Sequence, residues 1–207
     1  MKLYSQYGQD IYCYNHFFKG QLKGTFLEIG ADDGVDKSNT LFYENLGWNG
    51  VCVEPSPMRF KLLKKYRKCI CENYAIYEKK KTARFMDIMG WGKGLSGIIE
   101  LYDSRHLKRI DQELKHPMNK GCRIIDIECV SVNKLLGKHK MFKIDFCTID
   151  TEGGELEILK SIDMNRFEFK IFCIENNYSS KEIRHFMISA GFEMVTKLNI
   201  DEIYKRA

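Results

Sequence analysis

The stretch Thr25-Phe26-Leu27-Glu28-Ile29-Gly30-Ala31-Asp32-Asp33-Gly34 decides the fold. Its first five residues form an apolar run that predicts a short buried strand, and the next five predict a tight loop before a helix that opens at Ser38. A glycine-rich turn between a strand and a helix lets a ligand approach backbone N–H groups at the carboxyl edge of a sheet. The sequence therefore predicts an α/β protein with a ligand site beside Gly30.

The two aspartates of this loop, Asp32 and Asp33, indicate the kind of ligand. Their charges would repel a pyrophosphate and attract a cofactor that carries an ammonium and a sulfonium centre. Gly30 and Gly34 are spaced G-x-x-x-G, whereas dinucleotide-binding loops have G-x-G-x-x-G. We therefore expect S-adenosylmethionine rather than NAD, and an ordinary glycine turn with solvated aspartates is the alternative.

A second buried strand over residues 50–53 ends at Glu54. A carboxylate at the tip of the second strand, about 20 residues beyond the glycine loop, can accept hydrogen bonds from both hydroxyls of a ribose. Each such charge-assisted bond contributes roughly 1.5–3 kcal/mol. Residues 69–76 predict a third strand, and an adenine ring would lie at its carboxyl end beside Asn73 and Ala75.

Another buried strand, over residues 146–149, ends at Asp150 and is followed by Glu152. In a doubly wound sheet this strand lies beside the first, so both carboxylates would face the Gly30 loop across the crevice. Asp150 can orient the methionine part of the cofactor or act as a base toward a substrate hydroxyl. Glu175 ends the next strand at the same edge and is the second candidate base. Asp150 and Glu152 could also hold a divalent cation, but the sequence supplies no clear third ligand, and we predict no metal site.

Residues 77–123 follow a looser pattern and predict an insertion on the substrate side of a single domain spanning residues 1–207. Its glycine-dense loop at 90–97 offers Trp91 and Ser96 as substrate contacts, and residues 103–122 are expected to be solvent-exposed. Near the N-terminus, Gln9 and Asp10 are expected to contribute to a lid over the cofactor, although a helix-capping role for Asp10 is the simpler alternative.

Composition limits the class of protein. A chain of 207 residues can bury a full core without disulfides, and its eight cysteines include no C-x-x-C pair, so we expect buried thiols in a reducing compartment. The net charge of +5 arises largely from lysine-rich runs such as 61–68, which are typical of solvated helix faces, so nucleic-acid binding is unlikely on charge grounds. No apolar run reaches the roughly 20 residues of a membrane span, and no signal peptide is evident. We expect a cytoplasmic protein without a membrane span.

Six pieces, in this order along the chain, carry a resemblance to a known family. They are Ser5-Gln6-Tyr7-Gly8-Gln9-Asp10, the glycine-loop stretch 26–34, Ser38-Asn39-Thr40, Gly50-Val51-Cys52-Val53-Glu54-Pro55, Asn73-Tyr74-Ala75-Ile76 and Ile149-Asp150-Thr151-Glu152-Gly153-Gly154-Glu155. On these pieces the chain resembles the FkbM family of S-adenosylmethionine-dependent methyltransferases.

The resemblance implies a Rossmann-like class I methyltransferase fold, with a mostly parallel seven-stranded sheet, helices on both faces and an antiparallel last hairpin. It also implies O-methylation of hydroxyls on sugars, glycans or other small molecules. By the same resemblance, Glu28, Gly30 and Asp32 would line the methionine pocket, Glu54 would hold the ribose, and Asp150 with Glu152 would border the reaction centre. Two alternatives stay open: a nucleic-acid or cap methyltransferase, and a non-catalytic nucleoside-binding protein.

Overall fold

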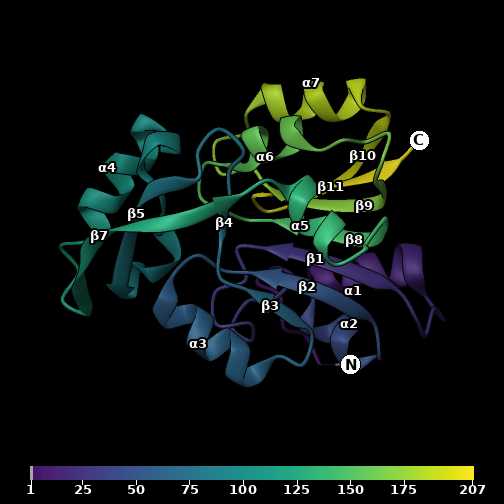
Figure 1. Ribbon diagram of the computed structural model, residues 1–207, viewed down its shortest axis with the longest axis horizontal. Helices are drawn as coiled ribbons and strands as arrows, with labels where there is room; N and C mark the ends of the chain where they lie inside the picture. The colour runs from purple at the N-terminus through teal and green to yellow at the C-terminus, as the bar shows by residue number, and fades with distance from the viewer. Residues whose placement is uncertain (1) are drawn as a thin grey trace.

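A seven-stranded sheet forms the centre of the computed structural model, which describes residues 2–207 (Figure 1). Its strands are β1 (Thr25–Ile29), β2 (Asn49–Val53), β3 (Ile70–Glu72), β8 (Lys143–Ile149), β9 (Glu168–Glu175), β10 (Phe192–Leu198) and β11 (Asp201–Arg206). They lie in the order β10-β11-β9-β8-β1-β2-β3, and β11 alone runs antiparallel to both of its neighbours. The predicted α/β class is confirmed, with a sheet that is mixed rather than purely parallel.

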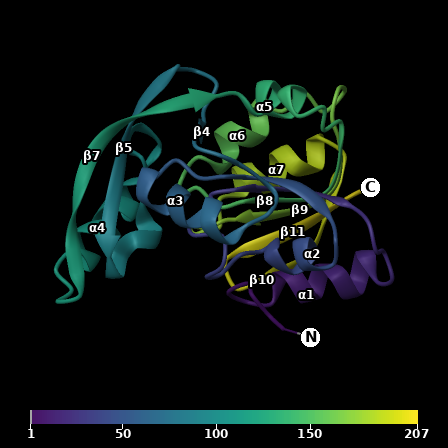
Figure 2. The ribbon, with the colours of Figure 1, turned by 60° about the horizontal axis from the view of Figure 1, so that its bottom comes forward.

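Helices cover both faces of this sheet, as Figures 1 and 2 show. One face carries α1 (Gln9–Cys13), the π-helical turn η1 (Tyr14–Phe18), α2 (Leu41–Asn45) and α3 (Pro57–Tyr66), and the other carries α5 (Val132–Lys138), α6 (Glu155–Ser161) and α7 (Lys181–Ser189). Side chains alternate across a strand, so in β1 Leu27 and Ile29 pack in the core under α5–α7, while Phe26 packs in the core under α1–α3.

The insertion builds a second, four-stranded sheet that projects to one side of the central sheet (Figures 1 and 2). It consists of β4 (Ala75–Ile76), β5 (Thr82–Gly90), β6 (Gly97–Ile98) and β7 (Asn119–Val130), with the 3₁₀ turns η2 (Trp91–Leu95) and η3 (Ile99–Leu101) and the helix α4 (Ser104–Glu113). The antiparallel pair of β5 and β7 is its main contact.

Two expectations for this region need correction. The predicted third strand, residues 69–76, is divided between the two sheets, because β3 pairs with β2 while β4 pairs with β7. The segment 103–122 is only partly exposed: α4 buries His106 and Ile110, and Ile110 packs with Ile88 and Leu95 in a small core of its own.

The basic run at 61–68 is also not solvated throughout. Arg67 is buried, and its guanidinium pairs with Glu28 Oε2 at 3.0 Å and with Glu44 Oε2 at 2.9 Å. Tyr66, the last residue of α3, is 48% exposed, although the helical spacing of Phe60, Leu63 and Tyr66 predicts that all three face the sheet. The ion pairs tie the end of α3 to β1 and α2 beneath the glycine loop.

All eight cysteines are free thiols. Cys13, Cys52, Cys129, Cys147 and Cys173 are buried, and the other three are half-buried or exposed. Within residues 2–207, every helix is too short or too polar to pass through a lipid bilayer.

Candidate functional site

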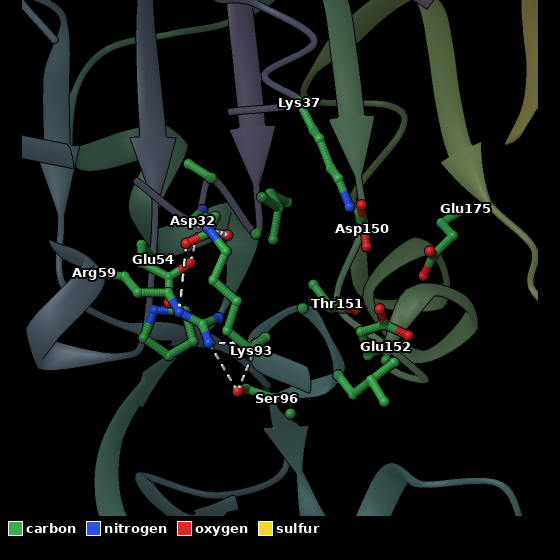
Figure 3. Close-up of a pocket in the computed structure, with 18 of the residues that line it drawn as sticks. Asp32, Lys37, Glu54, Arg59, Lys93, Ser96, Asp150, Thr151, Glu152 and Glu175 are labelled. Carbon is green, nitrogen blue, oxygen red and sulfur yellow. Dashed lines mark hydrogen bonds and ion pairs between the residues drawn. The ribbon is translucent and has the colours of Figure 1, made fainter. Parts of the chain in front are cut away.

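A cavity of about 350 Å³ lies where the carboxyl ends of β1, β2, β8 and β9 meet the second sheet (Figure 3). This volume falls in the range of small-molecule sites, roughly 300–1,000 Å³. The residues expected from the sequence that line it are Glu28, Gly30, Asp32, Glu54, Ala75, Trp91, Ser96, Asp150, Glu152 and Glu175.

The glycine loop joins two strands at the edge of this cavity. The N–H groups of Gly30 and Ala31 both donate to the carbonyl of Val53 at 3.0 Å, which fixes the loop to the end of β2. Gly30 has φ +87°, and a Cβ placed on it would lie 1.7 Å from the carbonyl oxygen of Asp150. Only glycine allows the loop to approach β8 so closely, and this contact brings Asp150 to the crevice.

Glu54 is buried at the tip of β2, 3% exposed. Its Oε2 accepts a hydrogen bond from Asp32 N at 2.9 Å, and its Oε1 accepts one from Ser56 N at 2.8 Å. Burial raises the pKa of Glu54 to about 8, against the opposing charge of Arg59. Since each carboxylate oxygen can accept two hydrogen bonds, Glu54 can still bind a pair of hydroxyls.

Basic side chains neutralise the acidic loop. Asp32 has φ +47°, and its carboxylate lies 3.3 Å from Arg59 Nε and 3.2 Å from Lys93 Nζ (Figure 3). Lys93 also approaches Asp33 and Asp36 at 4.0 and 3.6 Å. The charges of Asp32 and Asp33, from which the sequence argument for the cofactor started, are thus partly balanced by the protein itself, and Asp32 joins the glycine loop to α3 and η2.

Arg59 and Ser96 hold the loop that closes one side of the cavity. Arg59 Nη2 donates to the carbonyls of Ile88 and Lys93 and to Ser96 Oγ. Ser96 Oγ accepts from Ile88 N at 2.9 Å and donates to the carbonyl of Lys93 at 2.9 Å. Trp91, on the same loop, is 55% exposed and stacks on His116 with 4.5 Å between ring centroids.

Glu28 lines the cavity, but the chain itself uses its carboxylate. It accepts hydrogen bonds from Asn39 N at 2.9 Å, from Thr40 Oγ1 at 2.7 Å and from Arg67 Nη1 at 3.0 Å. These bonds fix Asn39, whose Nδ2 donates to Thr148 Oγ1 at 3.1 Å. The Asn39 Oδ1 is buried and has no hydrogen-bond partner among the described residues, so the cavity wall holds a free acceptor.

Three carboxylates meet at the opposite side of the cavity. Asp150 follows β8, Glu175 ends β9, and Glu152 lies between them in a left-handed backbone conformation, φ +60°. One oxygen from each lies within 4.8 Å of the others. Burial and the charge of Asp201 raise the pKa of Asp150 to about 7, and burial with the charge of Asp150 raises the pKa of both Glu152 and Glu175.

Three residues expected at the cofactor lie outside the cavity lining. Gln9 Nε2 donates to Asp201 Oδ2, Asp10 Oδ1 accepts from Ser5 Oγ at 2.6 Å, and Asn73 Nδ2 donates to the carbonyl of Glu54 at 2.8 Å. The first two order the N-terminal segment, and the third ties β3 to the end of β2. The N-terminal segment does reach the cavity, through Gln6 and Tyr7.

Several residues of the site were not predicted from the sequence. Asn39 belongs to a piece that carries the family resemblance, Ser38-Asn39-Thr40, but no role was assigned to it. No local pattern reveals that Arg59 and Lys93 pair with Asp32, or that Arg109 is linked to Glu152 through Asn177. Lys37 likewise extends toward Asp150 from the end of the glycine loop (Figure 3).

Comparison with known proteins gives one family. The Methyltransferase FkbM domain matches residues 28–194 of the chain. No curated protein sequence matches it.

Three solved structures with low sequence identity to this chain resemble it. The crystal structure of Methyltransferase FkbM from Methylobacillus flagellatus KT is 13% identical, with 94% of this chain and 47% of that chain covered and a TM-score of 0.48. The METTL16 MTase domain is 12% identical, covers 96% and 66%, and has a TM-score of 0.47. A human methyltransferase 10 domain containing protein is 15% identical, covers 91% and 73%, and has a TM-score of 0.40. The chain spans about half the length of the first and about two thirds of the second.

Proposed function

The chain belongs to the FkbM methyltransferase family, and we propose that it methylates a hydroxyl group of a sugar, a glycan or another small molecule. The family match implies S-adenosylmethionine as the cofactor. The observation that supports a hydroxyl acceptor is the group of carboxylates at the ends of β8 and β9, since a carboxylate is a good hydrogen-bond acceptor for an alcohol.

The residues of the cavity fit this cofactor. When bound, S-adenosylmethionine supplies an electrophilic methyl group on a sulfonium centre. We assign the ribose hydroxyls to Glu54, whose oxygens have lone pairs to spare, and the amino acid ammonium to the unpartnered Oδ1 of Asn39. Ala75 and Ile76 offer an apolar wall for the adenine ring. The free acceptors of the cavity thus suit a ligand rich in donors and positive charge.

On the acceptor side, we assign Asp150 and Glu175 the task of binding and orienting the reacting hydroxyl. Much of the rate can come from such orientation, because well-placed reactants gain effective molarities of about 10⁵–10⁸ M. The exposed ring of Trp91 gives a sugar an apolar surface to cover, and Ser96 holds the loop that carries it. Trp91 and Ser96 therefore stay the proposed substrate residues.

Nucleic acid is a second candidate acceptor, because His116, which stacks on Trp91, lies in the chain between the basic helix α4 and the start of β7, which carries Lys120 and Arg123. Aromatic side chains beside positive charge bind single-stranded nucleic acid. Such binding weakens as the salt concentration rises, because the release of counterions from the phosphates then contributes less to the affinity. The reaction centre itself, however, offers three carboxylates, which accept hydrogen bonds from a hydroxyl group. For this reason we favour an uncharged hydroxyl compound.

The test is methyl transfer from labelled S-adenosylmethionine to a panel of sugars, glycans and RNA, with Asp150→Asn and Glu168→Gln compared with the wild type. Glu168 is an exposed carboxylate at the opposite end of β9. We expect label in a glycan or small alcohol, a large loss in Asp150→Asn and normal transfer by Glu168→Gln. Transfer to RNA alone would replace the acceptor class, and cofactor binding without transfer to any acceptor would favour a non-catalytic protein.

A further inference from the structure

Asp150, Glu152 and Glu175 form a cluster of carboxylates that could do more than accept hydrogen bonds from a substrate. The three residues come from the end of β8, from the turn before α6 and from the end of β9, yet one oxygen of each lies within 4.8 Å of the others. The sequence offered only the first two as ligands. The parallel pairing of β8 with β9 supplies the third.

Glu175 is the most telling member of this group. The residue is 6% exposed, and its Oε2 is buried without a hydrogen-bond partner anywhere in the described chain. Figure 3 shows its carboxylate directed toward the space between Asp150 and Glu152. A buried acceptor without a donor destabilises the folded protein, and a charged one does so more strongly, so a ligand at this point would satisfy an unmet hydrogen-bonding group.

The surrounding positive charge does not balance the three acids. Among residues 2–207, His106 is the sole basic residue within 4.0 Å of any of them, at 3.5 Å from Glu152 Oε2. Lys37 extends toward Asp150 (Figure 3). Arg109 Nη1 donates to Asn177 Oδ1 at 3.5 Å, and Asn177 in turn donates to Glu152. Asp201 and Glu155 add further negative charge nearby. Buried carboxylates in such a setting require either protons or a cation.

We propose that Asp150, Glu152 and Glu175 bind one hard divalent cation, of the Mg²⁺, Mn²⁺ or Ca²⁺ kind. All three ligands offer oxygen, which these ions prefer over nitrogen and sulfur. Ligand oxygens around Mg²⁺ lie about 2.9 Å apart when adjacent and about 4.2 Å apart when opposite, and those around Ca²⁺ lie up to about 4.6–5.2 Å apart. The three carboxylate oxygens, within 4.8 Å of one another, lie near these distances, and small side-chain shifts would close them onto either ion.

Resting on the proposed function, the cation has a task in the same site. Three side chains leave coordination positions open, and the cavity gives an acceptor hydroxyl access to them. A hydroxyl bound to a divalent cation loses its proton more readily, as bound water does. Asp150, Glu152 and Glu175 would then orient the ion and, through it, the substrate oxygen.

The test is titration of the metal-free full chain with Mn²⁺, followed by the loss of the free Mn²⁺ signal in electron paramagnetic resonance. Glu175→Gln and Glu152→Gln each remove one charged ligand, and Glu168→Gln is the matched control on the same strand. We expect one Mn²⁺ per wild-type chain, unchanged binding by the control and at least about tenfold weaker binding by both ligand variants. Circular dichroism melting establishes that each variant is folded.

Wild-type protein that takes up no Mn²⁺ would overturn the proposal, and so would equal uptake by the wild type and a folded Glu175→Gln variant. S-adenosylhomocysteine is titrated separately in the presence of a chelator. If that compound binds while Mn²⁺ does not, the cation site fails and the methyltransferase proposal stands. If Mn²⁺ binds to the three carboxylates while S-adenosylhomocysteine does not, the site stands and the proposed function fails.

Discussion

Replacement of Gly30 by alanine tests whether the closeness of the glycine loop to β8 builds the site. Alanine at φ +87° costs about 1–2 kcal/mol for the left-handed backbone. Its Cβ would also lie 1.7 Å from the Asp150 carbonyl oxygen. The backbone fixes the positions of both atoms, so no side-chain rotation can relieve the clash. Overpacking of this kind costs about 1–3 kcal/mol. The two contributions together predict a loss of about 2–5 kcal/mol in the free energy of unfolding.

Gly20→Ala is the matched control. Gly20 has φ +84°, and a Cβ there would meet no atom within 4 Å, so this variant carries the backbone cost alone. Urea denaturation of both variants therefore isolates the contact with Asp150 as the difference between them. We also expect Gly30→Ala, and not Gly20→Ala, to weaken S-adenosylhomocysteine binding. Equal destabilisation by the two substitutions would refute the claim that loop and strand are in tight contact.

Three more variants test other parts of the account. Arg67→Met leaves the buried Glu28 and the half-buried Glu44 without their guanidinium and should cost about 3–5 kcal/mol in urea denaturation. Lys64→Met, on the exposed face of α3, should cost little, and similar losses in the two variants would contradict the buried network. Burial raises the pKa of Glu54 to about 8 from its ordinary 4.5, so the folded protein holds this proton more tightly than the unfolded chain. The stability of the wild type relative to Glu54→Gln should thus be highest below pH 4.5 and fall as pH rises to 8, and a pH-independent difference would contradict it. Arg59→Ala should speed amide hydrogen exchange over residues 88–96 by roughly tenfold, because it removes the charged donor that holds this loop. Lys61→Ala should leave the exchange unchanged. Unchanged exchange in Arg59→Ala would contradict the role of Arg59 in holding the loop.

Local patterns predicted the central sheet well. The apolar runs before Gly30, Glu54, Asp150 and Glu175 are short, rich in strand-forming residues and bounded by polar or glycine residues, so each was recognisable as a buried strand. Since the carboxyl ends of parallel strands meet at one edge, the acidic residues that follow them were also expected to gather there. These carboxylates do line one cavity.

Long-range contacts account for what the sequence did not show. The split of residues 69–76 depends on the pairing of β4 with the distant β7, which no local pattern reports. Arg67 lies in a run of lysines and is distinguished only by the two acids, Glu28 and Glu44, with which it pairs. Glu28 lines the cavity, but no local pattern reports that Asn39, Thr40 and Arg67 donate hydrogen bonds to its carboxylate. In each case the partner lies elsewhere in the chain, so composition and spacing could not predict it.

The most direct test of the central claim is calorimetric titration of the purified chain with S-adenosylmethionine, S-adenosylhomocysteine and NAD, repeated on Glu54→Ala. We predict that both adenosyl compounds bind at one site per chain, that NAD gives no heat, and that the variant binds roughly tenfold or more weakly, because it loses the carboxylate assigned to the ribose. No heat with either adenosyl compound, or binding of NAD in their place, would contradict the account of this cavity as a methyltransferase site.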